Sequence, residues 1–184
     1  MRKKKKQFNW KSLGRILVCI DAANLENSVK DLGWWVDYKK LYNFFKKQTK
    51  LVEVRHYCVR FNNQQHEKFL TVLKRAGIRL VTKPLKIIKK EDIERGDIRK
   101  ANFDVEIAVD TLLLSGKYDT FVLFSGDSDF DYLIKVLKKE ERKTVIVIST
   151  KHHISRELIS RCSFYLDLKR LKKFFQRRRR GFWS

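Results

Sequence analysis

The stretch Thr120-Phe121-Val122-Leu123-Phe124-Ser125-Gly126-Asp127-Ser128-Asp129-Phe130 decides the fold. Its first five residues form an apolar run that predicts a buried strand, and residues 131–137 have the spacing of an amphipathic helix. Asp127 and Asp129 therefore lie on a tight turn at the carboxyl end of a strand. In open α/β sheets, ligands bind at that end of the strands. A buried strand needs no acidic residues there, so the two carboxylates indicate a partner, and a divalent cation is the simplest one.

Further apolar and amphipathic segments alternate along the chain on both sides of this stretch. Strands are predicted at residues 15–20, 52–61, 78–81, 120–124, 143–148 and 164–166, the last as an edge strand. Helices are predicted at residues 37–48, 64–76, 104–114, 131–139, 155–160 and 168–175. This alternation predicts an α/β protein with a three-layer, doubly wound, mostly parallel sheet that carries helices on both faces, as in Rossmann-like folds.

Basic segments flank and interrupt the predicted domain. Residues 1–14 are predicted to form a basic N-terminal tail, residues 15–170 the domain, and residues 171–184 a basic C-terminal tail. Within the domain, residues 83–100 combine the one proline of the chain, Pro84, with many charges and no core pattern. That composition predicts a mobile basic loop.

The charge balance of the chain points to an anionic partner. Lys and Arg number 43 against 21 Asp and Glu in 184 residues, which gives a formal net charge of +22. Nucleic acid is the first candidate for such a partner, and an anionic membrane surface is the second. The longest apolar run near the N-terminus covers residues 16–20, which is too short for a signal-peptide core or a membrane span. We therefore expect no membrane association and a soluble, cytoplasmic protein, whose three cysteines are reduced.

The basic loop and the C-terminal tail contain the candidate nucleic-acid-binding residues. Their cationic side chains would attract the phosphate backbone without a fixed geometry and in a salt-dependent way. The alternative for the two tails is a solvated run of like charges with no binding role. The candidates are Lys83, Lys86, Lys89, Lys90, Arg99, Lys100, Arg177, Arg178, Arg179 and Arg180.

Acidic residues from three separate segments are predicted to meet at one edge of the sheet. Asp21 follows the first strand, Asp127 and Asp129 follow the strand at 120–124, and Asp104 begins a helix. In a right-handed doubly wound sheet, the first strand and the 120–124 strand can be neighbours at the switch point, so their carboxyl ends share a crevice. Four carboxylates in a crevice repel each other unless a cation neutralises them or they take up protons.

The chemistry of this acidic set favours Mg²⁺ or Mn²⁺ over zinc. Carboxylate oxygens are hard ligands, and neither Cys nor His accompanies them. Such ions serve phosphoryl chemistry by orienting a water molecule and stabilising the charge that develops on phosphate. Acidic residues for a metal, combined with basic residues for a phosphate backbone, are what a nuclease requires.

Each of these residues also has a structural interpretation. Asp21 alone would more often be a helix cap or turn former, and Asp104 could equally be an N-cap. Asn24 and Ser125 could support the acids or serve as local caps. Asp110 lies in an otherwise apolar helix and needs some partner, while Asp131 could be a ligand or a first-turn acid of its helix.

The ordered motifs of the chain resemble the NYN domain family, in its bacterial LabA-like branch, within the PIN-like nuclease fold. The resemblance covers roughly residues 15–170 and rests on the whole set rather than on any single motif. The matching pieces are Ile20-Asp21-Ala22-Ala23-Asn24-Leu25, Gly33-Trp34-Trp35-Val36-Asp37-Tyr38-Lys39-Lys40-Leu41, Lys68-Phe69-Leu70, Gly77-Ile78 with Thr82-Lys83-Pro84-Leu85, Phe103-Asp104-Val105-Glu106-Ile107-Ala108-Val109-Asp110, Ser125-Gly126-Asp127-Ser128-Asp129-Phe130 and Ser155-Arg156-Glu157-Leu158.

The resemblance implies a metal-dependent ribonuclease that hydrolyses phosphodiester bonds. By matching position, it assigns the acidic centre to Asp21, Asp104, Asp127 and Asp129, with Asn24 as a supporting polar residue and Asp110 in the family's helix pattern. Two features depart from the family. Asn102 and Phe103 stand where the family often has Gly and a β-branched residue, and Asp131 adds an acid where this branch commonly has an apolar residue.

These inferences lead to a first hypothesis of a Mg²⁺- or Mn²⁺-dependent endoribonuclease with all four aspartates as metal ligands. The expected partner is RNA, single-stranded in preference to duplex, with DNA and a homodimer left open. A second hypothesis is a non-catalytic RNA-binding module on the same fold. A third is a phosphatase or nucleotide hydrolase that uses the same metal.

Overall fold

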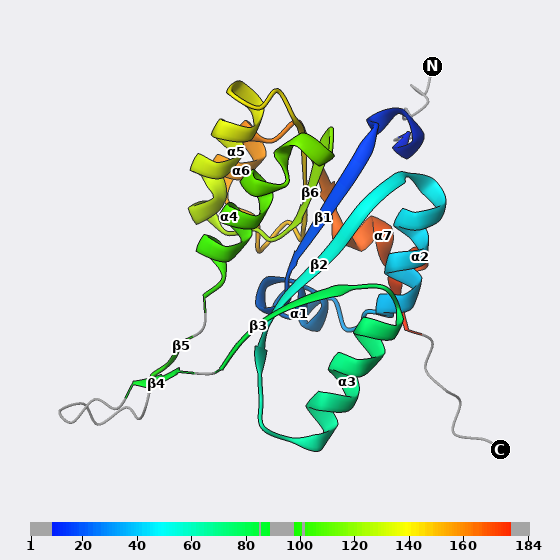
Figure 1. Ribbon diagram of the computed structural model, residues 1–184, viewed down its shortest axis with the longest axis vertical. Coiled ribbons are helices and arrows are strands. Elements are labelled where there is room, and N and C mark those ends of the chain that lie inside the picture. Colours follow the sequence, from blue (N-terminus) through cyan, green and yellow to red (C-terminus); the bar gives the residue numbers. More distant parts are fainter. Residues whose placement is uncertain (1–8, 85, 89–97, 101, 178–184) are drawn as a thin grey trace.

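Six parallel strands form the central sheet of the computed structural model, in the order β3-β2-β1-β6-β7-β8 (Figure 1). The structure describes residues 9–84, 86–88, 98–100 and 102–177. The strands of the chain are β1 (Arg15–Asp21), β2 (Lys50–Arg60), β3 (Arg79–Pro84), β4 (Lys86–Ile88), β5 (Ile98–Lys100), β6 (Thr120–Phe124), β7 (Thr144–Ser149) and β8 (Phe164–Asp167). The helices are α1 (Ala22–Asp31), α2 (Tyr38–Gln48), α3 (Gln64–Arg75), α4 (Asp104–Leu113), α5 (Asp131–Lys139), α6 (Arg156–Arg161) and α7 (Leu168–Phe175), with short 3₁₀ turns η1 (Trp10–Leu13), η2 (Ser115–Lys117) and η3 (Ser128–Phe130).

The strand order reverses between β1 and β6, and this switch point places the site. Strand β1 pairs in parallel with β2 on one side and with β6 on the other. Ile20 lies opposite Phe124, so the residues that follow, Asp21 and Ser125, leave the sheet at the same level. The predicted doubly wound topology and the predicted adjacency of these two strands are confirmed, and the switch point is where such sheets bind ligands.

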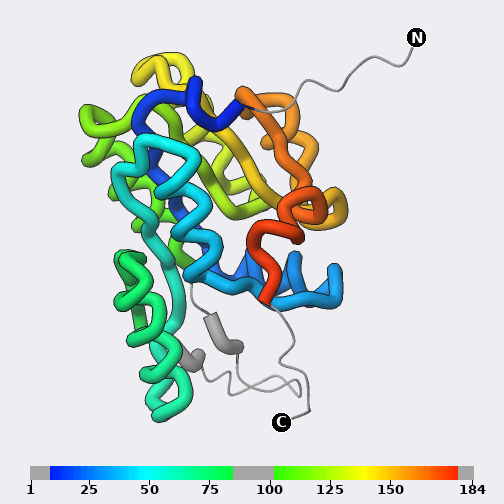
Figure 2. Tube along the Cα trace, turned by 90° about the vertical axis from the view of Figure 1, so that its right-hand side faces the viewer, coloured from blue at the N-terminus to red at the C-terminus, as the bar shows by residue number. Residues whose placement is uncertain are grey.

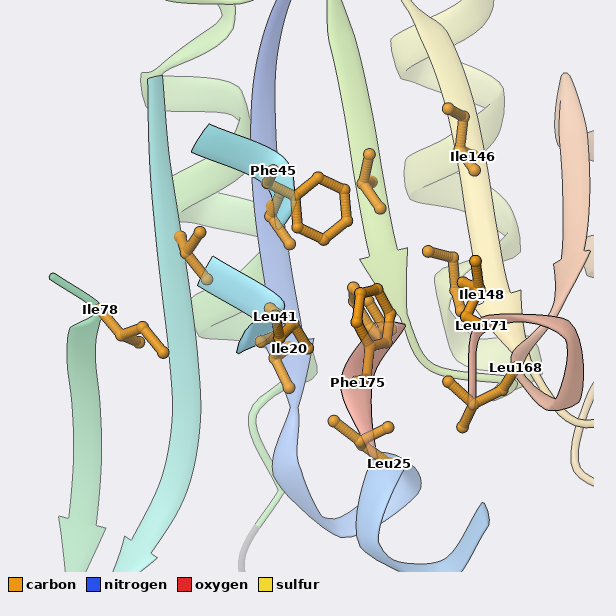
Figure 3. Packing of buried hydrophobic residues seen from close by; sticks show 14 of the residues in the cluster. Ile20, Leu25, Leu41, Phe45, Ile78, Ile146, Ile148, Leu168, Leu171 and Phe175 are labelled. Carbon is orange, nitrogen blue, oxygen red and sulfur yellow. The ribbon is translucent and has the colours of Figure 1, made fainter. Parts of the chain in front are cut away.

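Helices cover both faces of the sheet because successive side chains of each strand point to opposite sides. On β1, Ile16, Val18 and Ile20 belong to the core that packs against α1, α2, α3 and α7, whereas Leu17 and Cys19 face α4, α5 and α6. Figure 2 shows α2, α3 and α7 in front of the sheet. Phe45 of α2 and Phe175 of α7 meet over the centre of the sheet in Figure 3, with ring centroids 6.2 Å apart. The predicted three-layer architecture is confirmed.

The first helix, α1, is an element that the sequence patterns did not predict. It begins directly after Asp21, whose carboxylate accepts a hydrogen bond from the backbone N–H of Asn24 and so caps the helix. Leu25 and Val29 pack against the main core and Ala22 against a smaller cluster, which is too short a repeat to stand out in the sequence. Its position is nevertheless decisive, because α1 starts at the switch point.

The predicted mobile loop at 83–100 is wrong where the structure describes it. Lys83 and Pro84 belong to β3, and residues 86–88 pair with residues 98–100 as the antiparallel ribbon β4-β5. Figure 1 shows this ribbon extending away from the main sheet beyond the end of β3. Each arm is only three residues long, so it offers no periodic pattern from which the sequence could predict it.

The packed structure extends beyond residues 15–170 at both ends. Trp10 is 9% exposed and meets Phe45 edge-on, with ring centroids 5.3 Å apart. Leu171 and Phe175 are buried in the core, so α7 is part of the domain and not of a tail. Among the helices of the described part, none combines the length and the apolar character that a membrane crossing requires.

Candidate metal centre

The turn after β6 is clamped by its neighbours. A Cβ atom at Gly126 would lie 1.7 Å from the carbonyl oxygen of His153, so this position accommodates glycine alone. The Gly126 carbonyl accepts a hydrogen bond from Ser155 N at 2.9 Å, and its N–H donates to Asn24 Oδ1 at 3.3 Å. The turn is thereby held between α1 and the start of α6, which gives the acidic residues after it a defined position.

Three carboxylates converge in front of this turn. One oxygen each of Asp104, Asp127 and Asp129 lies within 4.8 Å of the other two. Asp104 and Asp127 are half-buried, and Asp129 is exposed. The carboxylate of Asp127 also accepts the backbone N–H of Asp129 at 3.1 Å, so the two acids of the turn are fixed relative to each other. Of the four aspartates that the sequence predicts to meet, the structure brings these three into one group.

Asp104 reaches the group as the first residue of α4. Its backbone N–H donates to Asn102 Oδ1 at 2.8 Å, a local turn that fixes the entry into the helix. Burial is the largest cause of the raised pKa of Asp104. A hydrogen bond with Asn102 lowers this pKa, and the charges of Asp127, Asp21 and Asp129 raise it further. Asp104 is thus an acid held in the field of three others, rather than a helix cap.

Asp21 lies beside the three-carboxylate group but is not within its 4.8 Å limit. It is 8% exposed, and its Oδ2 accepts hydrogen bonds from Asn24 Nδ2 at 2.7 Å and from Ser125 Oγ at 3.4 Å. Burial raises the pKa of Asp21, although these donors act in the opposite direction. Its charge still reaches Asp104, since it contributes to the raised pKa there.

Asn24 and Ser125 connect the acids to one another. Asn24 donates to Asp21 and accepts from Gly126, and so links α1 to the β6 turn. Ser125 is 1% exposed, and its hydroxyl oxygen accepts from the backbone N–H of Asp127 at 3.2 Å while its proton points to Asp21. Both residues therefore contact Asp21 directly, and their supporting role at the site stays a prediction.

Asp110 and Asp131 lie outside the group because each has a cation of its own. Asp110 pairs with the 8%-exposed Arg55 at 2.6 Å and accepts the Tyr57 hydroxyl at 3.0 Å. Asp131 pairs with Arg161 and is a first-turn acid of α5. In this geometry Asp129 lies beside Asp127, whereas Asp131 faces Arg161.

The predicted cationic residues are placed only in part. Lys83 is not a free loop residue, because its ammonium donates to the carbonyl of Asn102 at 2.9 Å, pairs with Glu106 at 2.5 Å and lies over the Phe103 ring. Arg177 is exposed and follows α7. Lys86, Arg99 and Lys100 lie on β4 and β5, whereas Lys89, Lys90, Arg178, Arg179 and Arg180 lie outside the described residues.

A pocket next to Asp21 is a feature that the sequence reasoning missed. It has a volume of about 320 Å³ and opens between the ends of β1 and β2, the start of α1 and helix α3. Aromatic side chains line it together with Asp21 and Glu26, whose pKa is raised by partial burial and by the nearby Asp21 charge. In the sequence, this pocket could have been suspected from two aromatic residues: Phe61, at the end of a predicted strand, and Phe103, just before a predicted helix.

Known proteins resemble this chain along almost its entire length. The family model described as NYN domain matches residues 15–169. The Low amplitude and bright protein LabA of Synechococcus elongatus is 30% identical over 168 residues, which are 90% of each chain. The crystal structure of a protein of unknown function from Vibrio parahaemolyticus superimposes with a TM-score of 0.73 at 21% identity, covering 92% of this chain and 99% of that one. This last likeness concerns the fold.

Proposed function

The chain belongs to the NYN domain family, whose members are generally metal-dependent nucleases, and we propose that it is a Mg²⁺- or Mn²⁺-dependent endoribonuclease. The observation that carries the proposal is the convergence of Asp104, Asp127 and Asp129 within 4.8 Å. Three carboxylates from two separate segments meet where a doubly wound sheet binds ligands, in a chain whose net charge is strongly positive.

The donor set fits a hard divalent cation. It consists of carboxylate oxygens, which Mg²⁺ and Mn²⁺ prefer, whereas zinc and softer metals favour imidazole and thiolate. The raised pKa of Asp104 reflects in part the repulsion that a bound cation would relieve. When bound, such an ion supplies a polarised water as nucleophile and neutralises charge on the scissile phosphate.

The four aspartates would have different roles at the site, according to their positions. Asp104, Asp127 and Asp129 would hold the metal. Asp21 would complete the negative field from the β1 side, with its orientation set by Asn24 and Ser125. Hydrogen bonds that fix the ligands of a metal usually matter for affinity nearly as much as the ligands themselves.

RNA is the proposed substrate because the acidic centre is set in a basic chain. The net charge of +22 raises the local concentration of a polyanion around the site and makes its binding salt-dependent. The positive charge that would contact the backbone includes Arg177 and the basic residues of the β4-β5 ribbon, which follows β3 in the chain.

The decisive experiment compares wild type with Asp127→Asn on labelled single-stranded RNA, duplex RNA and DNA, each with Mn²⁺ or EDTA. We expect Mn²⁺-dependent cleavage of single-stranded RNA by the wild type, and loss of cleavage with RNA binding retained or tightened in the variant. Asp119→Asn is the matched control, since Asp119 pairs with Arg15 at 2.9 Å at the amino end of β1, far from the acids.

Each outcome of that experiment separates the candidate functions. Undiminished cleavage by Asp127→Asn would refute the site assignment. Tight, salt-sensitive binding without cleavage under any condition would identify a non-catalytic RNA-binding module. Hydrolysis of nucleoside monophosphates without cleavage of polymers would identify a metal-dependent nucleotide hydrolase.

A further inference from the structure

The pocket beside Asp21 is built differently from the acidic centre that it adjoins. Its volume of about 320 Å³ lies in the range of small-ligand pockets. The rings of Phe61, Phe69 and Phe103 and the imidazole of His66 line it, and Asp21 forms part of its wall. An apolar, aromatic cavity is thus continuous with a site that binds a metal and a phosphate in our proposal.

Phe61 is the most accessible of these rings. It stands just beyond the end of β2, is 43% exposed, and meets the ring of His66 edge-on at a centroid distance of 5.0 Å. It also lines a neighbouring cavity of about 730 Å³ that contains Arg60 and Lys83. A large aromatic side chain at the shared wall of two cavities has a face available for stacking.

The lining of the pocket also offers polar groups. The carboxylate of Glu26 is a hydrogen-bond acceptor there. The ring of His66 is part of the same wall, while its Nε2 atom is buried beneath the surface and makes no hydrogen bond among the described residues. Aromatic faces combined with a few polar atoms are what an unstacked nucleobase requires of its binding site.

From this arrangement we infer that the pocket binds one nucleobase of a single-stranded substrate, next to the phosphate that reaches the acidic centre. Phe61 contacts the face of the base, and the carboxylate of Glu26 accepts a hydrogen bond from its polar edge. The strand continues past Phe61 into the larger cavity, where Arg60 and Lys83 lie. The ion pair of Arg60 with Glu67 is exposed to solvent, so Arg60 can exchange it for a phosphate at little cost.

The inference accounts for a preference that the metal centre alone does not supply. A base inside a duplex is paired and stacked, and it must leave the helix to enter a pocket, which costs a few kcal/mol by general estimates, whereas a base in a single strand is free to do so. The pocket therefore selects single-stranded over duplex substrate. This reasoning rests on the proposed nuclease function for the identity of the strand but not for the stacking itself.

A binding experiment in EDTA tests the pocket without requiring cleavage. Short single-stranded RNAs each carry one 2-aminopurine, a base whose fluorescence falls when it stacks, at successive positions. For the wild type we expect quenching at one position above all others. Phe61→Ala should bind that RNA roughly 5- to 150-fold more weakly and lose the quenching, because base stacking on an aromatic ring has that range of effects.

Two matched variants separate stacking from general damage. Phe61→Tyr keeps an aromatic face and should restore both quenching and affinity. Phe174→Ala removes a ring of similar exposure, 40% against 43%, from helix α7, and should resemble the wild type. An abasic residue at the quenched position should weaken the wild type by the same factor as Phe61→Ala and should leave the affinity of that variant unchanged.

The outcomes keep this inference distinct from the proposed function. Wild-type affinity and quenching in Phe61→Ala, or an abasic penalty that persists in that variant, would overturn the pocket assignment. Failure of the wild type to bind these RNAs would do the same. Binding of 2-aminopurine riboside monophosphate as tight as that of the RNA would refute the continuation of the strand past Phe61. Stacking in the pocket without Mn²⁺-dependent cleavage would support the pocket and refute the nuclease.

Discussion

Replacing Asp104 by Asn should make the metal-free protein more stable, although the residue is part of the candidate site. Asp104 lies within 4.8 Å of both Asp127 and Asp129, and these charges contribute to its raised pKa. Without a cation, the folded protein carries this repulsion and the unfolded chain does not. The substitution retains the shape of the side chain and removes its charge.

The size of the effect follows from Coulomb's law. Two unit charges at 4.8 Å repel by about 0.9 kcal/mol in bulk water and about 3.5 kcal/mol at the effective dielectric of a protein surface. Solvent screens these charges because Asp129 is exposed, so we take the bulk-water value, and two neighbours then give about 2 kcal/mol. The loss of an acid at a helix N-terminus subtracts about 0.3–1 kcal/mol. We expect a net gain of about 1–2 kcal/mol, which corresponds to about 2–8 °C in Tm.

Thermal unfolding in EDTA at low ionic strength and neutral pH measures this gain. Because the pKa of Asp104 is raised in the folded state, the folded protein binds that proton more tightly than the unfolded chain does. The wild type therefore recovers stability as the pH falls through this pKa, and the advantage of Asp104→Asn should vanish on acidification. Added Mn²⁺ should reverse the order, since a cation at a hundredfold excess over its Kd stabilises the wild type by about 2.7 kcal/mol.

Asp131→Asn is the matched control for this prediction. Asp131 is likewise the first residue of a helix, α5, but it faces Arg161 instead of other acids. Its replacement should lower stability by about 0.5–2 kcal/mol, through the same helix-terminus effect and the lost ion pair. If Asp104→Asn lowers the Tm in EDTA as Asp131→Asn does, the three carboxylates do not repel each other and the reasoning for a cation site fails.

Three further predictions test the surroundings of the site. Asn24→Ala should reduce cleavage about 10- to 100-fold and raise the Mn²⁺ concentration at half-maximal activity, because Asn24 orients Asp21. Gly126→Ala should cost about 3 kcal/mol or more in urea unfolding, since a Cβ would collide with the His153 carbonyl. Burial lowers the pKa of His56 to about 3, so wild-type stability should fall by about 1.4 kcal/mol per pH unit below about 6.5, and His56→Phe should remove that slope.

Each of these predictions has a control and a contrary outcome. Asn27→Ala, the same substitution at an exposed position of the same helix, should leave the metal dependence of cleavage unaltered. If Asn27→Ala and Asn24→Ala have equal effects, Asn24 does not position Asp21. Gly116 has open space at its Cβ position, so Gly116→Ala should be nearly neutral where Gly126→Ala is not. A pH slope that persists in His56→Phe would assign the acid sensitivity to other groups.

Local patterns predicted the elements whose apolar residues repeat clearly. Strand β6 and helices α5 and α7 have the predicted bounds, because each combines an uninterrupted apolar face with a clear start or end. Helix α1 and the β4-β5 ribbon were missed, since each carries too few apolar residues for its period to be recognised. Both depend on contacts with residues outside their own short segments, which no local window contains.

The candidate site divides in the same way. Local patterns are enough to show that acids follow β1 and β6 and begin α4, because strand ends and helix starts are local properties. Which of these acids meet depends on how distant segments pack. In the folded protein, Asp129 lies beside Asp127, whereas Asp110 forms an ion pair with Arg55 and Asp131 forms one with Arg161. The tertiary structure also created the aromatic pocket at Asp21 from four separate segments. The physical reason is that the charge around a carboxylate and the walls of a cavity depend on distance in space, which the chain order does not specify.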